Sequence, residues 1–223
     1  MTDFKNSWTR TWAGLHAQGN GDALLSELLS RYAEPHRSYH KLQHLGECLD
    51  GFDTVAHFAE RPAEVEAALW FHDAIYELAS HRNEEDSAMW AQQALTSAGV
   101  AAEAVARVAS LVLATKHTAL PERPDERLLV DIDLSILGAH PARFAEYEAQ
   151  IRIEYAFVPE AVFRSKRRAI LQAFLDRPHI FSTLHFRAAL EPTARVNLAR
   201  AVAQNSGTKC SLTADRTLPR PAP

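Results

Sequence analysis

The sequence predicts an all-α fold, a single compact helical bundle of about nine or ten helices. Two observations lead to this prediction. Apolar residues recur at three- and four-residue spacings along most of the chain, which is the pattern of amphipathic helices. No stretch alternates apolar and polar residues around a two-residue turn, as a β-hairpin would. The chain has 223 residues, of which 47% are hydrophobic, and this is enough for one domain with a sizeable core.

The first five predicted helices cover residues 4–18, 21–35, 40–59, 61–77 and 83–99. Phe4, Trp8 and Trp12 fall on one face of the first of them. Pro62 suits the first turn of the fourth, where the missing N–H of proline costs nothing. Gly99 is a fitting residue just beyond the fifth, because glycine tolerates the left-handed conformation that often ends a helix.

The remaining predicted helices cover residues 102–118, 124–138, 141–158, 159–177 and 183–204. The seventh is short and ends at Gly138, and the ninth opens with Pro159 in its first turn. Pro192 is a candidate break in the last helix. We expect one domain over residues 1–204. Residues 205–223 are polar and rich in proline, so we expect a disordered C-terminal tail there.

Charge and cysteine content exclude several classes of protein. The net charge is -4, from 24 basic and 28 acidic residues, and it favours neither nucleic acid nor an anionic membrane as a partner. No apolar run approaches the roughly 20 residues that span a bilayer, and the first residues lack the core of a signal peptide. Cys48 and Cys210 form neither a disulfide framework nor a zinc-finger spacing. We expect a cytoplasmic protein with a small-molecule partner, and a homo-oligomer stays open.

The stretch AALWFHDAIYE, residues 67–77, places an imidazole and a carboxylate in an apolar run, at His72 and Asp73. Burying a carboxylate is costly unless it is paired or bound to a cation. His44, Asp131 and Asp133 also lie where the periodicity predicts core or core edge. Two imidazoles and two carboxylates suit a borderline divalent metal, namely Mn, Fe, Co, Ni or Zn, and suit Mg less well. The alternative is a set of separate, hydrogen-bonded core residues.

The segments YHKLQHL, WFHDAIYE and DIDLSILG follow one another in the order His, His-Asp, Asp. This pattern resembles the HD-domain superfamily of metal-dependent phosphohydrolases. With RSYH, NEEDSA and EY, the chain resembles more narrowly the small bacterial predicted HD phosphohydrolases, from about Tyr32 to Asp176. The resemblance implies one or two divalent metal ions per chain (Mn, Co, Ni, Fe, Zn or Mg). It also implies that a metal-activated water hydrolyses a small phosphate ester, with nucleotides as one candidate class.

The resemblance implies His44, His72, Asp73 and one aspartate of the last motif as metal ligands. In related patterns the ligand is the Asp followed directly by Leu or by Arg-Leu, which favours Asp133 over Asp131. Asp133 also shares a helical face with Val130 and Leu137. Asp131 stays open as the alternative ligand, or as an N-cap or a support behind the ligands.

His117, Glu84 and Arg37 are the candidate catalytic residues. His117 lies where many HD proteins have another histidine, for a second metal, the phosphate or acid catalysis; the alternative is a histidine favoured by a helix C-terminus. Glu84 is a candidate proton acceptor near the metal, or part of a capping box. Arg37 is a candidate for bidentate phosphate binding, or a surface arginine.

Two segments near the C-terminus add further candidates. Arg152 is a second candidate for binding the phosphate, and we expect one residue of the segment QIRIEY to point inward to the site. The basic cluster RSKRRA, residues 164–169, is either a solvated helix face or a surface that steers an anionic substrate. No glycine-rich nucleotide loop is present in the sequence.

Three other functions compete with hydrolysis. An HD-fold di-iron oxygenase needs extra imidazole ligands, for which His117 and His40 are candidates. A non-catalytic module that senses a nucleotide or metal would keep the site without turnover. A purely structural helical protein would not bring these residues together at all.

Overall fold

The computed structural model describes residues 2–205, which contain ten α-helices, two 3-10 turns and no strand. The helices are α1 (Phe4–Gly14), α2 (Asp22–Tyr32), α3 (Leu42–Val55), α4 (Pro62–Phe71), α5 (Asn83–Ser97), α6 (Ala102–Ala114), α7 (Pro124–Asp133), α8 (Pro141–Glu154), α9 (Glu160–Leu175) and α10 (Leu184–Asn205), and the turns are η1 (Ala56–Phe58) and η2 (Leu134–Gly138). The predicted all-α fold and helix number are confirmed. The predicted tail lies outside the described residues except for Asn205, which ends α10.

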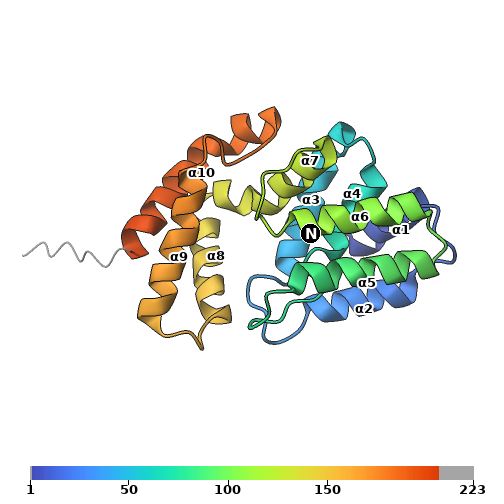
Figure 1. Ribbon diagram of the computed structural model, residues 1–223, viewed down its shortest axis with the longest axis horizontal. Helices are drawn as coiled ribbons and strands as arrows, with labels where there is room; N and C mark the ends of the chain where they lie inside the picture. Colours follow the sequence, from blue (N-terminus) through green and yellow to red (C-terminus); the bar gives the residue numbers. More distant parts are fainter. Residues whose placement is uncertain (1, 206–223) are drawn as a thin grey trace, which may run out of the picture.

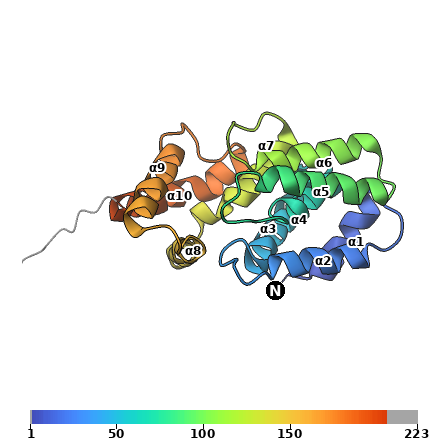
Figure 2. The same cartoon turned by 60° about the horizontal axis from the view of Figure 1, so that its bottom comes forward.

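Helix α4 lies at the centre of a body formed by α1–α7, where it contacts α1, α3, α5, α6 and α7. Every residue from Glu64 to Phe71 is buried, as expected of a helix that is covered on all sides. Figure 2 shows α3 and α4 between the pair α5–α6 and the pair α1–α2. The two acids of α4 are paired, Glu64 with Arg107 at 2.6 Å and Glu66 with Arg10 and Ser7.

Helices α8, α9 and α10 form an arm beside this body (Figure 1). Helices α9 and α10 pack against each other, and α10 and α8 both contact η2, which joins the arm to α7. Pro192 lies inside α10 without ending it, so the predicted break is wrong. Pro192 and Ala188 are both exposed, so the carbonyl that loses its helical donor can bond to water.

Two helix boundaries near the expected site differ from the prediction. Helix α4 ends at Phe71 instead of continuing to residue 77, and α3 begins at Leu42 instead of residue 40. Tyr32 donates its hydroxyl to the carbonyl of Trp70 at 3.2 Å, and Arg37 donates to the carbonyl of Ala74 at 3.0 Å. Side chains distant in sequence thus satisfy backbone groups that a longer helix would have paired internally.

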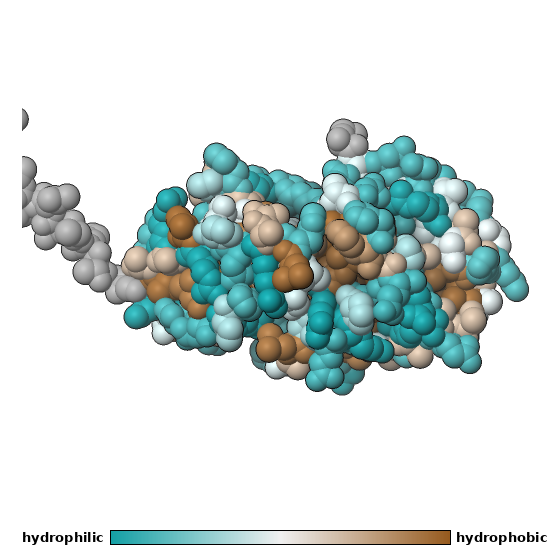
Figure 3. Space-filling model, turned by 90° about the horizontal axis from the view of Figure 1, so that it is seen from above, coloured by the Kyte–Doolittle hydropathy of each residue, from teal (hydrophilic) through white to brown (hydrophobic). Residues whose placement is uncertain are grey.

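The surface in Figure 3 is mostly hydrophilic, with hydrophobic residues in small separate patches. Among residues 2–205, the most exposed large apolar side chain is Leu184, in the first turn of α10. Among the described helices, none is both long and apolar enough to cross a membrane.

Candidate metal centre

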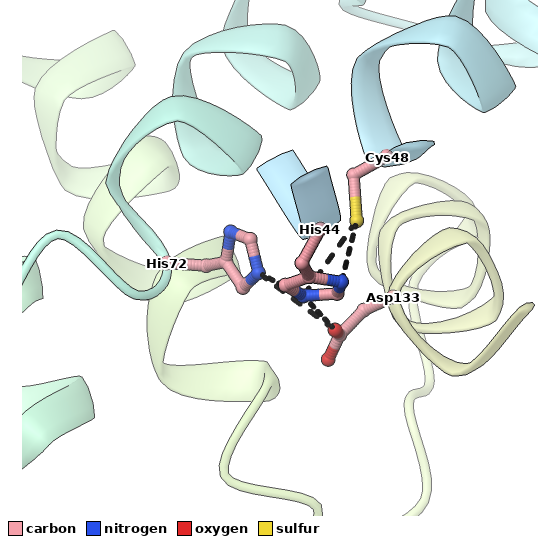
Figure 4. A group of neighbouring side chains, drawn as sticks. All are labelled: His44, Cys48, His72 and Asp133. Atoms are coloured by element: carbon pink, nitrogen blue, oxygen red, sulfur yellow. Dashed lines mark hydrogen bonds and ion pairs between the residues drawn. The ribbon is translucent and has the colours of Figure 1, made fainter. Parts of the chain in front are cut away.

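Side chains from three segments meet at one buried point between α3, α4 and α7. The Nε2 atom of His44 lies 3.1 Å from Nε2 of His72 and 3.2 Å from Oδ1 of Asp133. Oδ2 of Asp73 lies 3.1 Å from Nε2 of His72 and 3.5 Å from Nε2 of His44. Figure 4 shows His44, His72 and Asp133 turned toward one another. The structure therefore brings together all four residues that the sequence offers as metal ligands.

The separations suit an ion at the centre of this group. Two ligand atoms that are each about 2.1 Å from a metal lie roughly 3.0 Å apart in an octahedral site and roughly 3.4 Å apart in a tetrahedral one. The distances given above fall around these values, and the pair of His72 Nε2 and Asp133 Oδ1 is 3.7 Å apart. The mixed nitrogen and oxygen donors favour a borderline divalent ion.

The hydrogen bond of His72 fixes which of its ring nitrogens faces the group. Its Nδ1 atom lies 2.7 Å from the carbonyl oxygen of Leu69, so Nδ1 carries the proton and donates it. In the neutral ring Nε2 then bears the lone pair. That lone pair points at Nε2 of His44, which either carries a proton and donates it to His72 or shares a bound cation with it.

The charges at this point attract positive charge. Burial alone would raise the pKa of Asp133, but hydrogen bonds to His117 and His44 outweigh burial and hold its pKa well below the usual value. Burial alone would lower the pKa of His72, but the charge of Asp73 outweighs it and raises that pKa. The raised pKa of His72 favours a proton at this point, so a metal ion bound there must compete with protons.

Cys48 is a fifth neighbour that the sequence analysis did not assign to the site. Its Sγ atom lies 3.7 Å from Nδ1 and 3.8 Å from Nε2 of His44 (Figure 4). The group of His44, Cys48, His72 and Asp133 can hold a metal ion, since one ligand atom from each lies within 4.8 Å of the others. The signal was present in the sequence, because residues four apart share a helix face.

A cavity of about 440 Å³ opens beside the cluster and reaches the arm. Its lining includes Asp73, Asp133, His117, Glu84 and His40. His117 adopts a left-handed conformation, with φ 55°, three residues beyond the end of α6, and its Nε2 lies 3.0 Å from Oδ2 of Asp133. Its Nδ1 is buried and has no hydrogen-bond partner among the described residues. A buried polar atom without a partner calls for an explanation such as a ligand or water in the cavity.

Glu84 lies in the first turn of α5 and faces the same cavity. The capping-box interpretation of this segment is wrong, because the N-cap residue Arg82 makes no side-chain capping bond. Asn83 is instead bonded through its side chain to the backbone of Glu77, at 2.9 and 3.1 Å.

Arg37 does not have either of the roles expected from the sequence. Its side chain is fully buried, so it is no surface arginine. Its Nε donates to Glu34 at 3.0 Å, and its terminal nitrogens donate to the carbonyls of His40, Asp73 and Ala74. No donor is left for a phosphate, and Arg37 instead holds the main chain that follows His72. Arg152 donates to the carbonyls of Tyr155 and Val158 and pairs with Glu160.

The two aspartates of the last motif have different surroundings. Asp131 is completely buried and accepts hydrogen bonds from the backbone N–H groups of Ser182 and Thr183, both at 2.7 Å. Burial raises its pKa despite these bonds. Asp131 thus anchors the chain that enters α10 and does not cap its own helix, whereas Asp133 faces His44 and His117.

Two residues of QIRIEY that the sequence analysis considered lie inward, because Glu154 is buried and Tyr155 lines the cavity. One carboxylate oxygen of Glu154 accepts from the backbone N–H groups of Ser38, Tyr39 and His40, at 2.7–2.9 Å. The other lies 2.8 Å from Nδ1 of His40. Glu154 therefore fixes the segment that precedes the first ligand and orients the imidazole of His40.

No family model matches the chain, and neither the curated proteins nor the solved structures include a match to it.

Proposed function

We propose that this protein is a metal-dependent phosphohydrolase of the HD-domain superfamily, acting on a small phosphate ester. The observation that supports the proposal most directly is the convergence of His44, His72, Asp73 and Asp133, of which the two aspartates line a cavity. The order of these ligands along the chain is the second support. A nucleotide is one candidate substrate, because 440 Å³ lies within the usual range of small-molecule sites.

In this proposal the two imidazoles offer Nε2 and the two carboxylates offer oxygen atoms to one divalent ion. The bound ion supplies the Lewis acidity that hydrolysis of a phosphate ester requires. The burial of His44 and His72 excludes competing water from the ring nitrogens, and the bond from Nδ1 of His72 to Leu69 places the lone pair of the neutral ring on the ligand atom Nε2.

Two cavity residues are placed to move protons. The Nε2 atom of His117 is bonded to Asp133, so a protonated ring carries its second proton on the unpartnered Nδ1. We assign this proton to the leaving oxygen of the ester. Glu84, which lines the same cavity, is assigned as the acceptor of the proton from the attacking water.

One observation favours a second candidate, the di-iron oxygenase. His40 and His117 line the cavity, and each has one ring nitrogen bonded to a carboxylate, of Glu154 and Asp133 respectively. Ligand histidines commonly carry such a carboxylate on the nitrogen that does not bind metal. Two equivalents of iron together with turnover that depends on oxygen would support the oxygenase over the hydrolase.

Metal analysis of protein purified without added metal tests the site. We expect the wild type to retain about one or two equivalents of metal and Asp73→Ala to retain almost none. The matched control is Asp50→Ala, an exposed aspartate of α3. Equal metal in all three proteins would remove the basis of the proposal. A panel of phosphate esters, assayed with the retained metal, then tests the reaction.

A further inference from the structure

The two arginines that were expected to bind phosphate bind other groups of the protein, so another cation is needed to bind an anion in the cavity. Arg37 and Arg152 bond to backbone carbonyls and to Glu34 and Glu160. Among the described residues, the cavity lining contains two permanent cations, Lys116 and Arg167. Lys116 is partly exposed and pairs with Glu85.

Arg167 is buried in the wall that the arm contributes. Its residue exposure is 8%, although it belongs to the basic segment RSKRRA, whose neighbouring Arg168 is exposed. Its Nε donates to Glu148 at 3.1 Å, and one terminal nitrogen donates to the same carboxylate oxygen. The guanidinium carbon lies 4.9 Å from the ring centre of Tyr147. Glu148 and Tyr147 thus hold the guanidinium in one orientation at the cavity.

Tyr39 provides an independent observation that points to a ligand at this wall. Its residue exposure is 4%, it lines the cavity, and its hydroxyl has no hydrogen-bond partner among the described residues. A buried hydroxyl is rarely left unpaired, because it loses its bonds to water. The ring centre of Tyr39 lies 4.5 Å from that of Tyr147 and 4.7 Å from that of His44. Tyr39 therefore stands between the metal ligands and the ring that supports Arg167.

We propose that Arg167 and Tyr39 form an anion subsite that binds the phosphate group of the substrate. The inference rests on the proposed hydrolase function and names the residues that recognise its substrate class. Arg167 offers a rigid fork of N–H donors, the geometry that suits phosphate oxygens, and Tyr39 offers one O–H donor. A phosphate held between them lies next to the ligand cluster, because Tyr39 packs against His44.

The charges around the cavity explain why a cation is needed there. Asp73, Asp133 and Glu84 give the lining negative charge, which repels a phosphate dianion. A bound divalent ion offsets part of that charge on one side, and Arg167 supplies positive charge on the other. Phosphate should therefore bind more tightly to the metal-loaded protein than to the protein treated with chelator.

The test is calorimetric titration of the metal-loaded protein with inorganic phosphate. The variants are Arg167→Gln, Arg167→Lys and Tyr39→Phe, and the matched control is the exposed Arg168→Gln. We expect the dissociation constant to rise by about tenfold or more for Arg167→Gln, and by about three- to tenfold for the other two, since charge-assisted bonds are lost. Arg168→Gln should bind like the wild type. All variants should retain the metal content of the wild type.

A second measurement separates recognition from a structural role of Tyr39. Without phosphate, Tyr39→Phe should melt at the wild-type temperature or above it, because the deleted hydroxyl has no protein partner. Saturating phosphate should then raise the melting temperature of the wild type more than that of the variant. This comparison decides the matter even where Arg167→Gln does not fold.

The outcomes distinguish this inference from the function on which it rests. No phosphate binding by the wild type, or equal binding by wild type, Arg167→Gln and Tyr39→Phe, overturns the subsite. If a phosphate ester is hydrolysed and both substitutions leave KM unchanged, the hydrolase stands and the subsite fails. If no ester is hydrolysed but phosphate binding depends on Arg167, the subsite stands and the hydrolase fails.

Discussion

The body of α1–α7 and the arm of α8–α10 differ in what they bury and in what they give to the cavity. In α4 every residue from Glu64 to Phe71 is buried, whereas α9 buries only Arg167 and Leu171. All four candidate ligands come from the body, and the arm supplies the wall with Tyr147 and Arg167. Dense packing positions the ligand atoms to within tenths of an ångström, which a metal site needs. Substitutions in the more exposed arm can therefore change this wall of the cavity without moving the candidate ligands.

The largest expected effect separates a ligand from an anchor within α7. Asp133→Ala should abolish phosphoesterase activity, because it removes a ligand oxygen and the partner of His117. Asp131→Ala should lower activity by about tenfold, because it only releases the main chain at Ser182 and Thr183. Steady-state kinetics with metal content measured in parallel would check this. The reverse ranking would make Asp131 the ligand and contradict our division of roles.

The second prediction concerns the stability of the body. Arg37→Met should lower the free energy of unfolding by about 3 kcal/mol, because it leaves the carbonyls of Asp73 and Ala74 without this donor and removes the buried partner of Glu34. The matched control is Arg31→Met, since Arg31 is 45% exposed and pairs with the same Glu34. It should cost less than about 0.5 kcal/mol. Urea unfolding of both variants measures the difference, and similar values would show that Arg37 does not hold this chain.

The third and smallest effect tests how the arm is joined to the body. Burial would raise the pKa of Glu154, but its interactions with His40 and with backbone N–H groups outweigh burial and lower that pKa below the 4.5 of an ordinary glutamate. A lowered pKa stabilises the fold above the unfolded-state value, and the contribution is lost as the pH falls through the folded-state value. Glu154→Gln should therefore cost about 2 kcal/mol at pH 7.

The pH dependence of that cost is the check on Glu154. The difference in unfolding free energy between wild type and Glu154→Gln should shrink as the pH falls below about 4.5, because the carboxylate of the wild type becomes protonated. Thermal or urea unfolding across the acid range measures it. A difference that stays constant with pH would mean that the carboxylate charge does not hold the arm to the body.

The fold was predictable because helix periodicity is a local property of the sequence. The end of α4 at Phe71 was not predictable. No glycine or proline lies in the next six residues, and the side chains that bind the backbone there, Tyr32 and Arg37, are distant in the chain. The same reason hid the role of Asp131, whose partners lie about fifty residues further on. These contacts depend on tertiary structure, which the local periodicity of the sequence does not report.

The residues near the site were predictable to different degrees. His44, His72, Asp73 and Asp133 stood out as polar residues at core positions, and the structure brings them together. Arg167 was hidden in a basic segment, although its spacing of four from both Phe163 and Leu171 marks an inward face. The positive charge of this segment favoured a solvated helix face or a steering surface, so the sequence analysis did not place Arg167 in the interior.

Glu154 and Asp131 bind main-chain N–H groups, and this choice of partner affects how the protein can evolve. Every amino acid except proline carries that donor, so substitutions in the bound segments leave the attachment intact. The side chain at position 39 is thereby free to change while its backbone stays in place, whereas a change at His40 also removes the bond from its ring to Glu154. Selection can retune the chemistry of this wall through single substitutions, without first having to rebuild the loop that presents them.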